Sequence, residues 1–235
     1  MNLGQVYSTL YAKLGKDQYG GYISPNKFND ALYYVNLIMF NRYSDALEIT
    51  SEISDDIYVF TKTLGDNEIP PLELNSYGYG QLPEDFIKQV RAHVYGYTNT
   101  SCTTSEKETY MVTIMSNDKF NGRIARRGTI LKPNRKYPIG TIQNSKLYVQ
   151  PAGYTKCVFT YLRQPVTPVF GYTIVDDEPI YDPATSVELE WPEQVHDAFV
   201  DELVKYFAIT FQSEFSLQTS EPDKPLSTYR TLLMY

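Results

Sequence analysis

Apolar side chains recur with helical spacing in the first part of the chain. Between positions 3 and 14 they come every three or four residues, and Gly15 follows the last of them. This spacing predicts a helix with one apolar stripe that stops at the glycine. Ser24-Pro25 predicts a second helix start, because serine caps exposed N–H groups and proline needs none at the first helical position. We expect this helix to end near Tyr43. Its predicted buried face consists of Phe28, Ala31, Leu32, Val35 and Met39.

The middle of the chain changes from helical spacing to short apolar runs separated by proline and glycine. Pro83 still predicts one short helix that continues to Val90. From Tyr110 the runs are typical of strands, at 110–115, 128–131, 147–149 and 156–161. Asn121-Gly122 predicts a tight turn. The regular spacing of these strands predicts an antiparallel sheet or a small barrel rather than strand–helix–strand units.

The clearest predicted element is a long amphipathic helix near the C-terminus. Trp191-Pro192-Glu193 supplies its start, with proline and an acidic side chain in the first turn. Apolar side chains then recur every four residues, which builds one stripe along a helix. The stripe consists of Val195, Phe199, Leu203, Phe207, Phe211 and Phe215. The polar residues that follow include Pro222 and Pro225 and predict an extended tail.

Together these elements predict an α+β fold in a single domain that covers residues 1–235. N-terminal helices come first, a central antiparallel β-sheet or small barrel follows, and a long C-terminal amphipathic helix leads into an extended tail. By position, we expect residues 1–95 to be mainly helical and residues 105–180 to be mainly β. The C-terminal helix is expected over 190–215 and the tail over 216–235. The length and the hydrophobic content of 42% suit a globular chain with a sizeable core.

Charge is distributed unevenly along the chain. There are 21 basic and 28 acidic side chains, which gives a net charge of −7. Residues 119–175 hold ten basic side chains and no acidic one, so the other 178 residues carry 11 basic and 28 acidic ones, or −17. Asp118 precedes the basic block and Asp176-Asp177-Glu178 follows it. This pattern predicts a strongly dipolar molecule.

A cluster of basic residues within this block is the candidate site for a subunit interface or for DNA. Phosphate contact with nucleic acid and contact with an acidic protein surface are its two functional interpretations. A solvated face that acidic residues of the same chain neutralise is the third. The overall acidity argues against a free-standing DNA-binding domain. The cluster consists of Arg123, Arg126, Arg127, Lys132, Arg135 and Lys136.

The end of the predicted tail is apolar. Leu232, Leu233, Met234 and Tyr235 follow a spacer that contains two prolines. An isolated apolar tip cannot bury itself, so these residues are candidates for docking on another subunit. A disordered terminus is the alternative interpretation.

Several classes of function lack the residues that their chemistry needs. Two cysteines and two histidines make no cluster suited to structural zinc, and we expect both thiols to be reduced and packed. There is no phosphate-binding glycine loop and no recognised catalytic constellation. We therefore expect no catalytic residue, no metal site, no cofactor and no enzyme activity. No apolar run is long enough to span a bilayer, and the first residues do not resemble a secretory signal. We expect synthesis in the cytoplasm. We expect no contact with a membrane.

The order of several short motifs is similar to that in a known group of proteins. The motifs are Leu82-Pro83-Glu84-Asp85-Phe86, Phe120-Asn121-Gly122-Arg123, Lys132-Pro133, Tyr137-Pro138, Leu147-Tyr148-Val149-Gln150-Pro151, Val158-Phe159-Thr160-Tyr161-Leu162-Arg163-Gln164-Pro165 and Leu189-Glu190-Trp191-Pro192. In this order, over residues 25–215, the chain resembles virion structural proteins of tailed bacteriophages. It most resembles the neck or head–tail connector ring proteins of crAss-like phages.

The resemblance implies a structural protein and not an enzyme. Connector proteins of this kind form rings, commonly dodecamers, between the portal and the tail, and DNA passes through them. We therefore expect a homo-oligomeric ring, a dodecamer as is common among such proteins, with adjacent portal and tail proteins as partners. Phage DNA would pass without sequence-specific contact. The expected location is the neck or tail of the virion, after assembly in the host cytoplasm.

Two other functions stay open at this point. The 22 tyrosines suit a Tyr-rich β module that binds carbohydrate, as in a receptor-binding tail protein, where exposed rings grouped in a cleft stack on sugars. A hydrolase that uses carboxylates such as Glu188 and Glu190 is the other, because catalytic carboxylate pairs need not be neighbours in sequence. The native mass separates a ring from a monomer that binds glycans.

Overall fold

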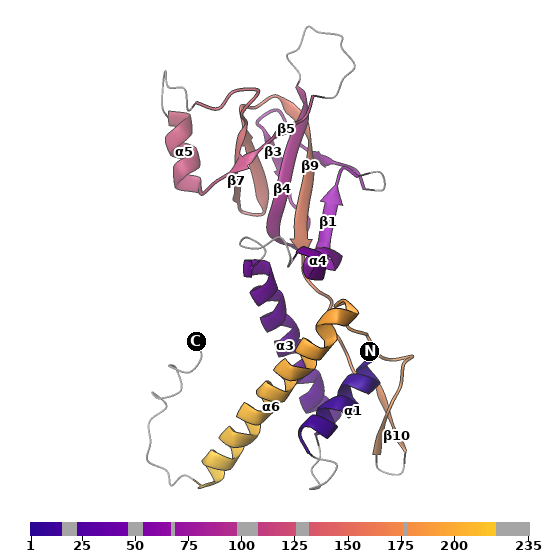
Figure 1. Cartoon of the computed structure of the whole chain (residues 1–235). Helices are drawn as coiled ribbons and strands as arrows, with labels where there is room; N and C mark the ends of the chain where they lie inside the picture. Colours follow the sequence, from indigo (N-terminus) through magenta and orange to yellow (C-terminus); the bar gives the residue numbers. More distant parts are fainter. Residues whose placement is uncertain are drawn as a thin grey trace. The chain divides into compact units, whose positions relative to one another are not determined.

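The helices near the two ends of the chain belong to one unit of the structure, and the strands between them belong to another. In the computed structural model, unit 1 comprises Met1–Asp56 and Pro165–Tyr235, and unit 2 comprises Ile57–Gln164 (Figure 1). The structure describes residues 1–15, 23–46, 54–66, 69–97, 108–125, 132–175 and 178–219, with side chains except at 54, 55, 97 and 212–219.

The first two helices of unit 1 begin where the sequence predicts. In front of α1 (Leu3–Lys13), the Asn2 side chain accepts a hydrogen bond from the backbone N–H of Gln5 at 2.9 Å. In front of α3 (Pro25–Ala46), Ser24 Oγ accepts one from the backbone N–H of Lys27 at 3.3 Å. Both caps satisfy N–H groups that have no partner inside a helix. The apolar face predicted for the second helix is buried throughout.

The long C-terminal helix is also present. α6 (His196–Thr219) follows a short 3₁₀ turn, η3 (Glu193–Val195), and packs on both α1 and α3. Its stripe is buried at Val195, Phe199, Leu203 and Phe207, and partly buried at Phe211. The side chain of Phe215 lies outside the described residues. Because α6 continues to Thr219, residues 216–219 are helical and not part of an extended tail.

A cluster of aromatic rings around Phe170 joins distant parts of unit 1. The Phe170 ring lies 4.8 Å from the Tyr7 ring on α1 and 5.3 Å from the Phe28 ring on α3. It also lies 5.6 Å from the Tyr181 ring of a hairpin formed by β10 (Tyr172–Val175) and β11 (Glu178–Tyr181). Tyr181 rests against Gly4, where a Cβ atom would come within 2.9 Å of the tyrosine ring. The hairpin is thereby fixed to the side of α1.

Unit 2 consists of two sheets. In the first, the long strands β4 (Phe86–Tyr97) and β9 (Tyr154–Arg163) pair with each other and with β1 (Thr61–Leu64), β2 (Leu72–Glu73) and β5 (Tyr110–Met111). The second has the order β3 (Tyr79–Gln81), β8 (Lys146–Gln150), β7 (Ile139–Gln143) and β6 (Thr113–Ile114). The described pairs are antiparallel, except that β6 and β7 are parallel. The predicted α+β class is confirmed.

One apolar core lies between the two sheets of unit 2. It contains Val94 and Phe159 from the first sheet and Leu147 and Val149 from the second. Alternation along β8 explains the arrangement, because Leu147 and Val149 point into the core while the residues between and beside them do not. The central β region is therefore built from two packed sheets, of the two-layer kind that sandwiches use.

The sequence misplaced some elements before residue 126. The helix predicted from Pro83 to Val90 is wrong, because this segment enters β4. The strands β1, β2 and β3 and most of β4 also fall within residues 1–95, which we expected to be mainly helical. Aromatic and β-branched side chains favour strands, and Ala92 and Val94 alternate into the core. The tight turn predicted at Asn121-Gly122 is also wrong, since both residues lie in α5 (Asn117–Ala125). No atom lies within 4 Å of a Cβ built on Gly122, so that side of the helix faces open space.

Strands are present at three of the four positions where the sequence predicts them. β5 and β6 lie within the predicted run 110–115, β8 contains residues 147–149, and β9 contains residues 156–161. The strand predicted at 128–131 lies outside the described residues. A short helical segment, α4 (Ser54–Ile57) with the 3₁₀ turn η2 (Tyr58–Phe60), occupies part of the acidic stretch before the first strand.

The burial of the α6 stripe gives a direct stability prediction. Phe207 is 1% exposed, so Phe207→Ala removes a packed ring and should lower the free energy of unfolding of unit 1 by about 3–5 kcal/mol. Ile209 on the same helix is 65% exposed, and Ile209→Ala should cost far less. The chain has a single tryptophan, Trp191 in unit 1, so urea unfolding followed by its fluorescence reports this unit. Equal effects of the two substitutions would show that the stripe is misassigned.

Candidate interaction surfaces

The division into units separates the charges of the chain. Unit 1 carries 7 basic and 20 acidic side chains, a net charge of −13. Unit 2 carries 14 basic and 8 acidic side chains, a net charge of +6. The two values cover all residues and give the −7 of the whole chain. The uneven charge along the sequence is therefore a difference between two folded bodies.

The predicted basic cluster lies on two segments of unit 2. Arg123 is on α5, and Lys132, Arg135 and Lys136 are on the segment that leads to β7. Arg126 and Arg127 lie outside the described residues. Arg135 donates from Nη2 to Glu108 Oε2 at 3.2 Å, so one cation of the cluster is neutralised within the chain. Lys132 and Lys136 are exposed, and neither forms an ion pair with a described residue.

The remaining cations of the basic block are spread over unit 2 and not gathered in one site. Lys146 Nζ lies 5.4 Å from the centre of the Tyr79 ring, and Arg163 lies 5.6 Å from the centre of the Phe60 ring. Lys156 on β9 is directly opposite Glu73 on β2. Several of these cations thus have aromatic or acidic neighbours. Lys119, Lys132, Lys136 and Lys156 are the exposed cations among the described residues of the block.

One carboxylate ties three strands of unit 2 together. Asp85, at the start of β4, accepts hydrogen bonds from Lys62 Nζ of β1 at 2.6 Å and from the Tyr161 hydroxyl of β9 at 2.9 Å. Partial burial alone would raise the pKa of Asp85, but the bonds from Lys62 and Tyr161 outweigh it and lower that pKa below its usual value. Burial, together with the bond to this carboxylate, raises the pKa of Tyr161 to about 12.

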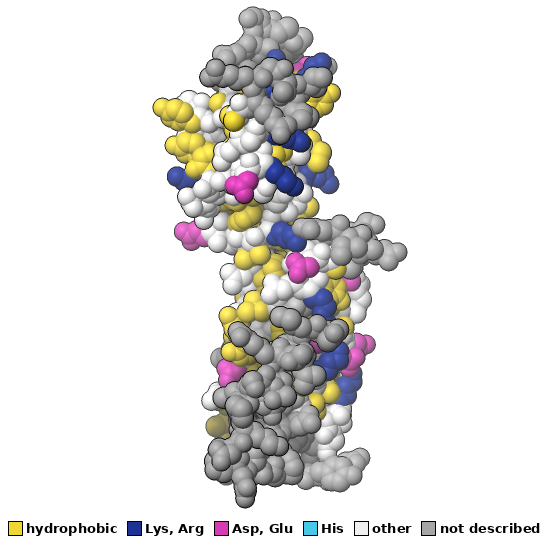
Figure 2. Space-filling model, turned by 90° about the vertical axis from the view of Figure 1, so that its left-hand side faces the viewer, with side chains coloured by type: hydrophobic (Ala, Val, Ile, Leu, Met, Phe, Trp, Pro, Cys, Tyr) yellow, Lys and Arg dark blue, Asp and Glu magenta, His cyan; other side chains and the backbone are white. Residues whose placement is uncertain are grey.

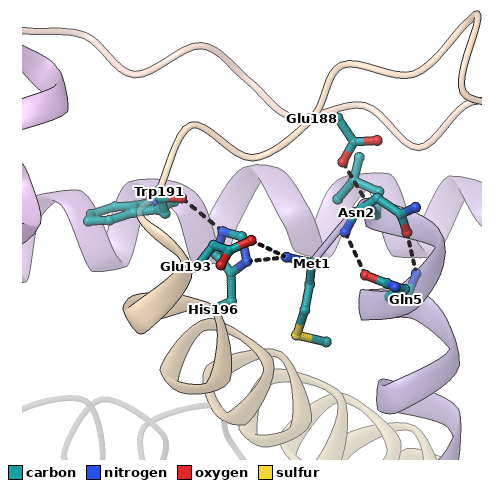
Figure 3. A network of polar contacts seen from close by, with 8 residues as sticks. Met1, Asn2, Gln5, Glu188, Trp191, Glu193 and His196 are labelled. Atoms are coloured by element: carbon teal, nitrogen blue, oxygen red, sulfur yellow. Dashed lines mark hydrogen bonds and ion pairs between the residues drawn. The ribbon is translucent and has the colours of Figure 1, made fainter.

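A chain of polar contacts holds the start of α1 against the start of α6 in unit 1 (Figure 3). His196 Nε2 donates to the Trp191 carbonyl oxygen at 2.8 Å, because a carbonyl can only accept. Nδ1 is then free to accept from the Met1 amine at 3.0 Å. Glu193 Oε1 lies 3.8 Å from the same amine. His196, which sequence analysis left without a role, is therefore a buried connector between helices.

The same network extends to the buried Asn36 of α3. Trp191 Nε1 donates to Asn36 Oδ1 at 2.8 Å, and Asn36 Nδ2 donates to the Val166 carbonyl oxygen at 3.2 Å. Both polar ends of the amide are satisfied, which is what burial of such a group requires. The asparagine that interrupts the apolar run of α3 in the sequence is explained by these two bonds.

The two carboxylates considered for hydrolysis also have structural partners. Glu188 Oε2 accepts from the backbone N–H of Leu3 at 2.8 Å (Figure 3). Glu188 Oε1 accepts from the Tyr181 hydroxyl. Glu190 Oε2 accepts from the backbone N–H of Val166 at 2.8 Å. Each carboxylate joins segments of unit 1 that are far apart in sequence. These hydrogen bonds explain its position without a role in hydrolysis.

A cavity of about 360 Å³ opens in unit 1 between α3, α4 and α6. Its apolar part comes from Met39, Ala46 and Ala198. On its polar side, Arg42 donates to Glu202 Oε1 at 2.7 Å, and Lys205 donates to the same oxygen at 2.9 Å. The bond from Arg42, opposed by partial burial, lowers the pKa of Glu202. Two cations therefore share one oxygen of this carboxylate.

Three tyrosines form a row on the outer side of the second sheet of unit 2. Tyr79 on β3 is directly opposite Tyr148 on β8, and their rings are 5.6 Å apart. Tyr77 lies beside Tyr79, with ring centres 6.3 Å apart and planes inclined by 13°. Tyr77 is 74% exposed, so the row ends in an open aromatic face. The sequence indicated abundant tyrosine but not this grouping.

The turn that carries Tyr77 is fixed by one side chain. Asn75 Oδ1 accepts from the backbone N–H groups of Tyr77 at 3.0 Å and Tyr79 at 3.1 Å. Gly78 has a φ of +82°, and a Cβ there would collide with the Val149 carbonyl oxygen. The only residue that fits this position without strain is glycine. The exposed ring is thus presented by a well-defined turn.

Apolar side chains also lie open to solvent in both units, as Figure 2 shows for one face of the molecule.

Among the described residues there is no group of three or more histidine, cysteine, aspartate or glutamate side chains placed to hold a metal ion. Within the same residues no helix is both long and apolar enough to cross a membrane. Burial raises the pKa of the Cys157 thiol to about 12, so this cysteine is packed as expected, while Cys102 lies outside the described residues. The tail-docking candidates Leu232, Leu233, Met234 and Tyr235 also lie outside them.

Comparison with known proteins gives no relative. No protein-family model matches the sequence, and no curated protein matches it.

The Asp85 cluster predicts how the stability of unit 2 depends on pH. The pKa of Asp85 is lowered in the folded protein, so its contribution is present above the unfolded pKa of about 3.9 and is lost as the pH falls through the folded value. Asp85→Asn should therefore cost up to about 1 kcal/mol at neutral pH, since the pair with Lys62 is partly exposed, and less in acid.

Circular dichroism during urea unfolding at pH 7 and in acid measures this difference for both units, and Trp191 fluorescence serves as the control for unit 1. A penalty of Asp85→Asn that stays constant as the pH falls below 4 would contradict the assigned role of the carboxylate.

Proposed function

We propose that this chain is a structural virion protein that forms an oligomeric ring in the head–tail connector of a tailed phage. The resemblance in motif order suggests this class. The observation that carries the proposal is the charge division between two folded units, −13 on unit 1 and +6 on unit 2. Portal and tail proteins would be its neighbours, and phage DNA would pass through the ring.

The charge division supports a ring because it makes the two units of neighbouring copies complementary. Unit 2 of one copy is attracted to unit 1 of the next and repelled by that copy's unit 2. A contact between two different surfaces is heterologous, and repeated heterologous contacts close a ring when the rotation allows it. Charge of this kind sets orientation and the rate of encounter more than affinity, because exposed ion pairs contribute only about 0–1 kcal/mol each.

The same division suits passage of DNA. After the cations of unit 2 are matched, each copy retains the net −7 of the chain. Net negative charge at a channel wall repels phosphates and prevents the duplex from binding there. The competing interpretation, in which the basic cluster including Arg123, Arg126 and Arg127 contacts DNA phosphates, predicts retention of DNA.

Two pairs of substitutions with equal charge change test the proposal. Lys132→Gln with Lys136→Gln removes two positive charges from unit 2, and Asn26→Asp with Asn41→Asp adds two negative charges to exposed positions of α3 in unit 1. The first pair should slow assembly, whereas the second should leave it unchanged or speed it. The effect should be largest at 0.01 M salt, where charges act over about 30 Å, and small at 0.15 M, where they act over about 8 Å.

Light scattering without DNA gives the assembly rate, and a filter-binding assay gives DNA retention. Equal slowing by both pairs would show that only total charge matters and would contradict the head-to-tail arrangement. Unchanged assembly with reduced DNA retention in the Lys132 and Lys136 variant would favour the phosphate interpretation instead.

The apolar end of the tail gives a second prediction. We expect removal of residues 226–235 to weaken assembly while the remaining chain stays folded, because Leu232, Leu233, Met234 and Tyr235 would be buried on another subunit. Native mass spectrometry measures the oligomer, and Trp191 fluorescence checks the fold of unit 1. Assembly equal to that of the intact chain would refute docking of the tail.

The tyrosine row of unit 2 favours a second candidate function, binding of carbohydrate. Tyr77 is 74% exposed, and Tyr137, elsewhere in the same unit, is 72% exposed but outside the row. Glycan binding that is lost in Tyr77→Ala and kept in Tyr137→Ala would identify the row as a sugar platform. A strictly monomeric chain with this behaviour would replace the ring proposal. No glycan binding by the intact chain would remove this candidate.

A further inference from the structure

Unit 1 exposes an apolar surface on two helices and a second surface, on a hairpin, that mixes apolar and polar side chains. The helix face consists of Tyr33, Tyr34, Ile38, Tyr206 and Ile209, on the outer sides of α3 and α6. The hairpin face consists of Thr173, Val175, Glu178 and Ile180, on one side of the β10–β11 hairpin. Single exposed apolar residues are ordinary, but grouped ones mark sites of interaction.

The helix face is a continuous surface. Tyr34 and Ile38 are one turn apart on α3, and Tyr206 and Ile209 are one turn apart on α6. The rings of Tyr34 and Tyr206 stack across the two helices with centres 6.1 Å apart and planes inclined by 18°. Ile38 is 47% exposed, although α3 and α6 bury other apolar residues against each other.

The hairpin face is equally open. Tyr172, Ile174, Pro179 and Tyr181 share the opposite side of the hairpin, where Tyr181 packs against α1. The hairpin face therefore points away from α1, and Ile180 on it is 51% exposed. β10 and β11 pair with each other and with no other described strand. A two-stranded hairpin is only marginally stable by itself, so cover for this side would stabilise it.

Charge along the two surfaces is complementary. On the helix face, Arg42 lies one turn beyond Ile38, and both Arg42 and Lys205 pair with the single carboxylate of Glu202. Asp30 lies at the other end, one turn before Tyr34. The hairpin face carries Glu178 at the start of β11. The Glu178 end of the hairpin face should therefore lie at Arg42 and not at Asp30.

The two surfaces cannot meet within one molecule. The hairpin is fixed to α1 through Gly4 and Tyr181, and α1 packs on α6. Figure 1 shows α1 between the hairpin and the pair formed by α3 and α6. Because both surfaces belong to the same chain and lie on different sides of unit 1, their complementarity can be used only between copies.

We propose that the hairpin face of one copy docks on the helix face of a second copy, with Glu178 at Arg42. This inference rests on the proposed ring, for which it supplies the apolar contact between neighbouring subunits. The contact is heterologous, so each copy offers one surface to each neighbour, as a closed ring requires. The apolar residues give the affinity, and the charges of the units give the orientation.

Two single substitutions and their mixture test the contact. Ile38→Asp disables the helix face and leaves the hairpin face intact, and Ile180→Asp does the reverse. Each variant alone should remain a monomer of 27.0 kDa in native mass spectrometry, whereas the intact chain assembles. An equal mixture should give a dimer of twice that mass and nothing larger, because only one productive contact remains. Ile174→Asp, at a position 68% exposed on the opposite side of the same hairpin, makes the same charge change in unit 1, is the matched control and should assemble normally.

The outcomes separate this inference from the ring itself. If the intact chain assembles and both variants assemble equally well, the docking contact is wrong and the ring proposal stands. If the intact chain is a monomer at every concentration and salt, both fail. A mixture that stays monomeric overturns the docking contact, provided that Trp191 fluorescence shows folded variants. Should either variant unfold, Ile209→Asp on the helix face and Val175→Asp on the hairpin face replace it, with the same expected dimer.

The tail is the main competitor for the helix face. If it docked there instead, Ile180→Asp would assemble normally, and removal of residues 226–235 would reproduce the defect of Ile38→Asp. That combination would overturn the proposed contact.

Discussion

The packing of α6 against α1 and α3 is the interaction on which unit 1 depends, because it joins segments from the two ends of the chain. Unit 2 lies between those segments in sequence, and closing a loop of about 100 residues costs about 4 kcal/mol in chain entropy. Burying a phenylalanine or leucine side chain returns about 1.5–3 kcal/mol. Phe199, Leu203 and Phe207 together therefore offset the closure. The network of His196, Trp191 and Asn36 then fixes the register in which the helices meet.

Insertion of a basic β unit into an acidic helical unit has a consequence for assembly. The charges are carried by two bodies that fold around separate cores, so their separation is a fixed property of each subunit. Such a subunit favours neighbours that place unlike units together. The exposed helix and hairpin faces of unit 1 supply apolar area for the same arrangement. In this account electrostatics selects the orientation of two copies, and apolar burial holds them.

Local signals in the sequence were sufficient for the helices of unit 1. Leu3, Val6 and Leu10 gave α1, Ser24-Pro25 gave the start of α3, and the four-residue repeat gave α6. The longest mispredicted segment is the one that enters β4. It was predicted as a helix because Pro83 and a few apolar residues resemble a helix start. Only the long-range pairing of β4 with β9 decides in favour of a strand, and that pairing has no local signature.

The surfaces were less accessible to sequence reasoning than the helices. The uneven charge was visible in the sequence. Its assignment to two units was not, because it depends on the segment from Pro165 onward belonging to the same unit as the N-terminal helices. The tyrosine row depends on the register that sets Tyr79 opposite Tyr148, and the helix face depends on α3 and α6 being neighbours. Asn36 was a detectable signal, because a lone asparagine within an apolar run indicates a buried hydrogen-bonding partner.

The central claim is that copies of this chain associate head to tail through different surfaces. Electron microscopy of the purified full-length chain at low salt tests it most directly. The account predicts closed particles with a single rotational symmetry, in which every subunit has the same two neighbours. Particles with only a twofold axis, or single subunits under all conditions, would contradict it.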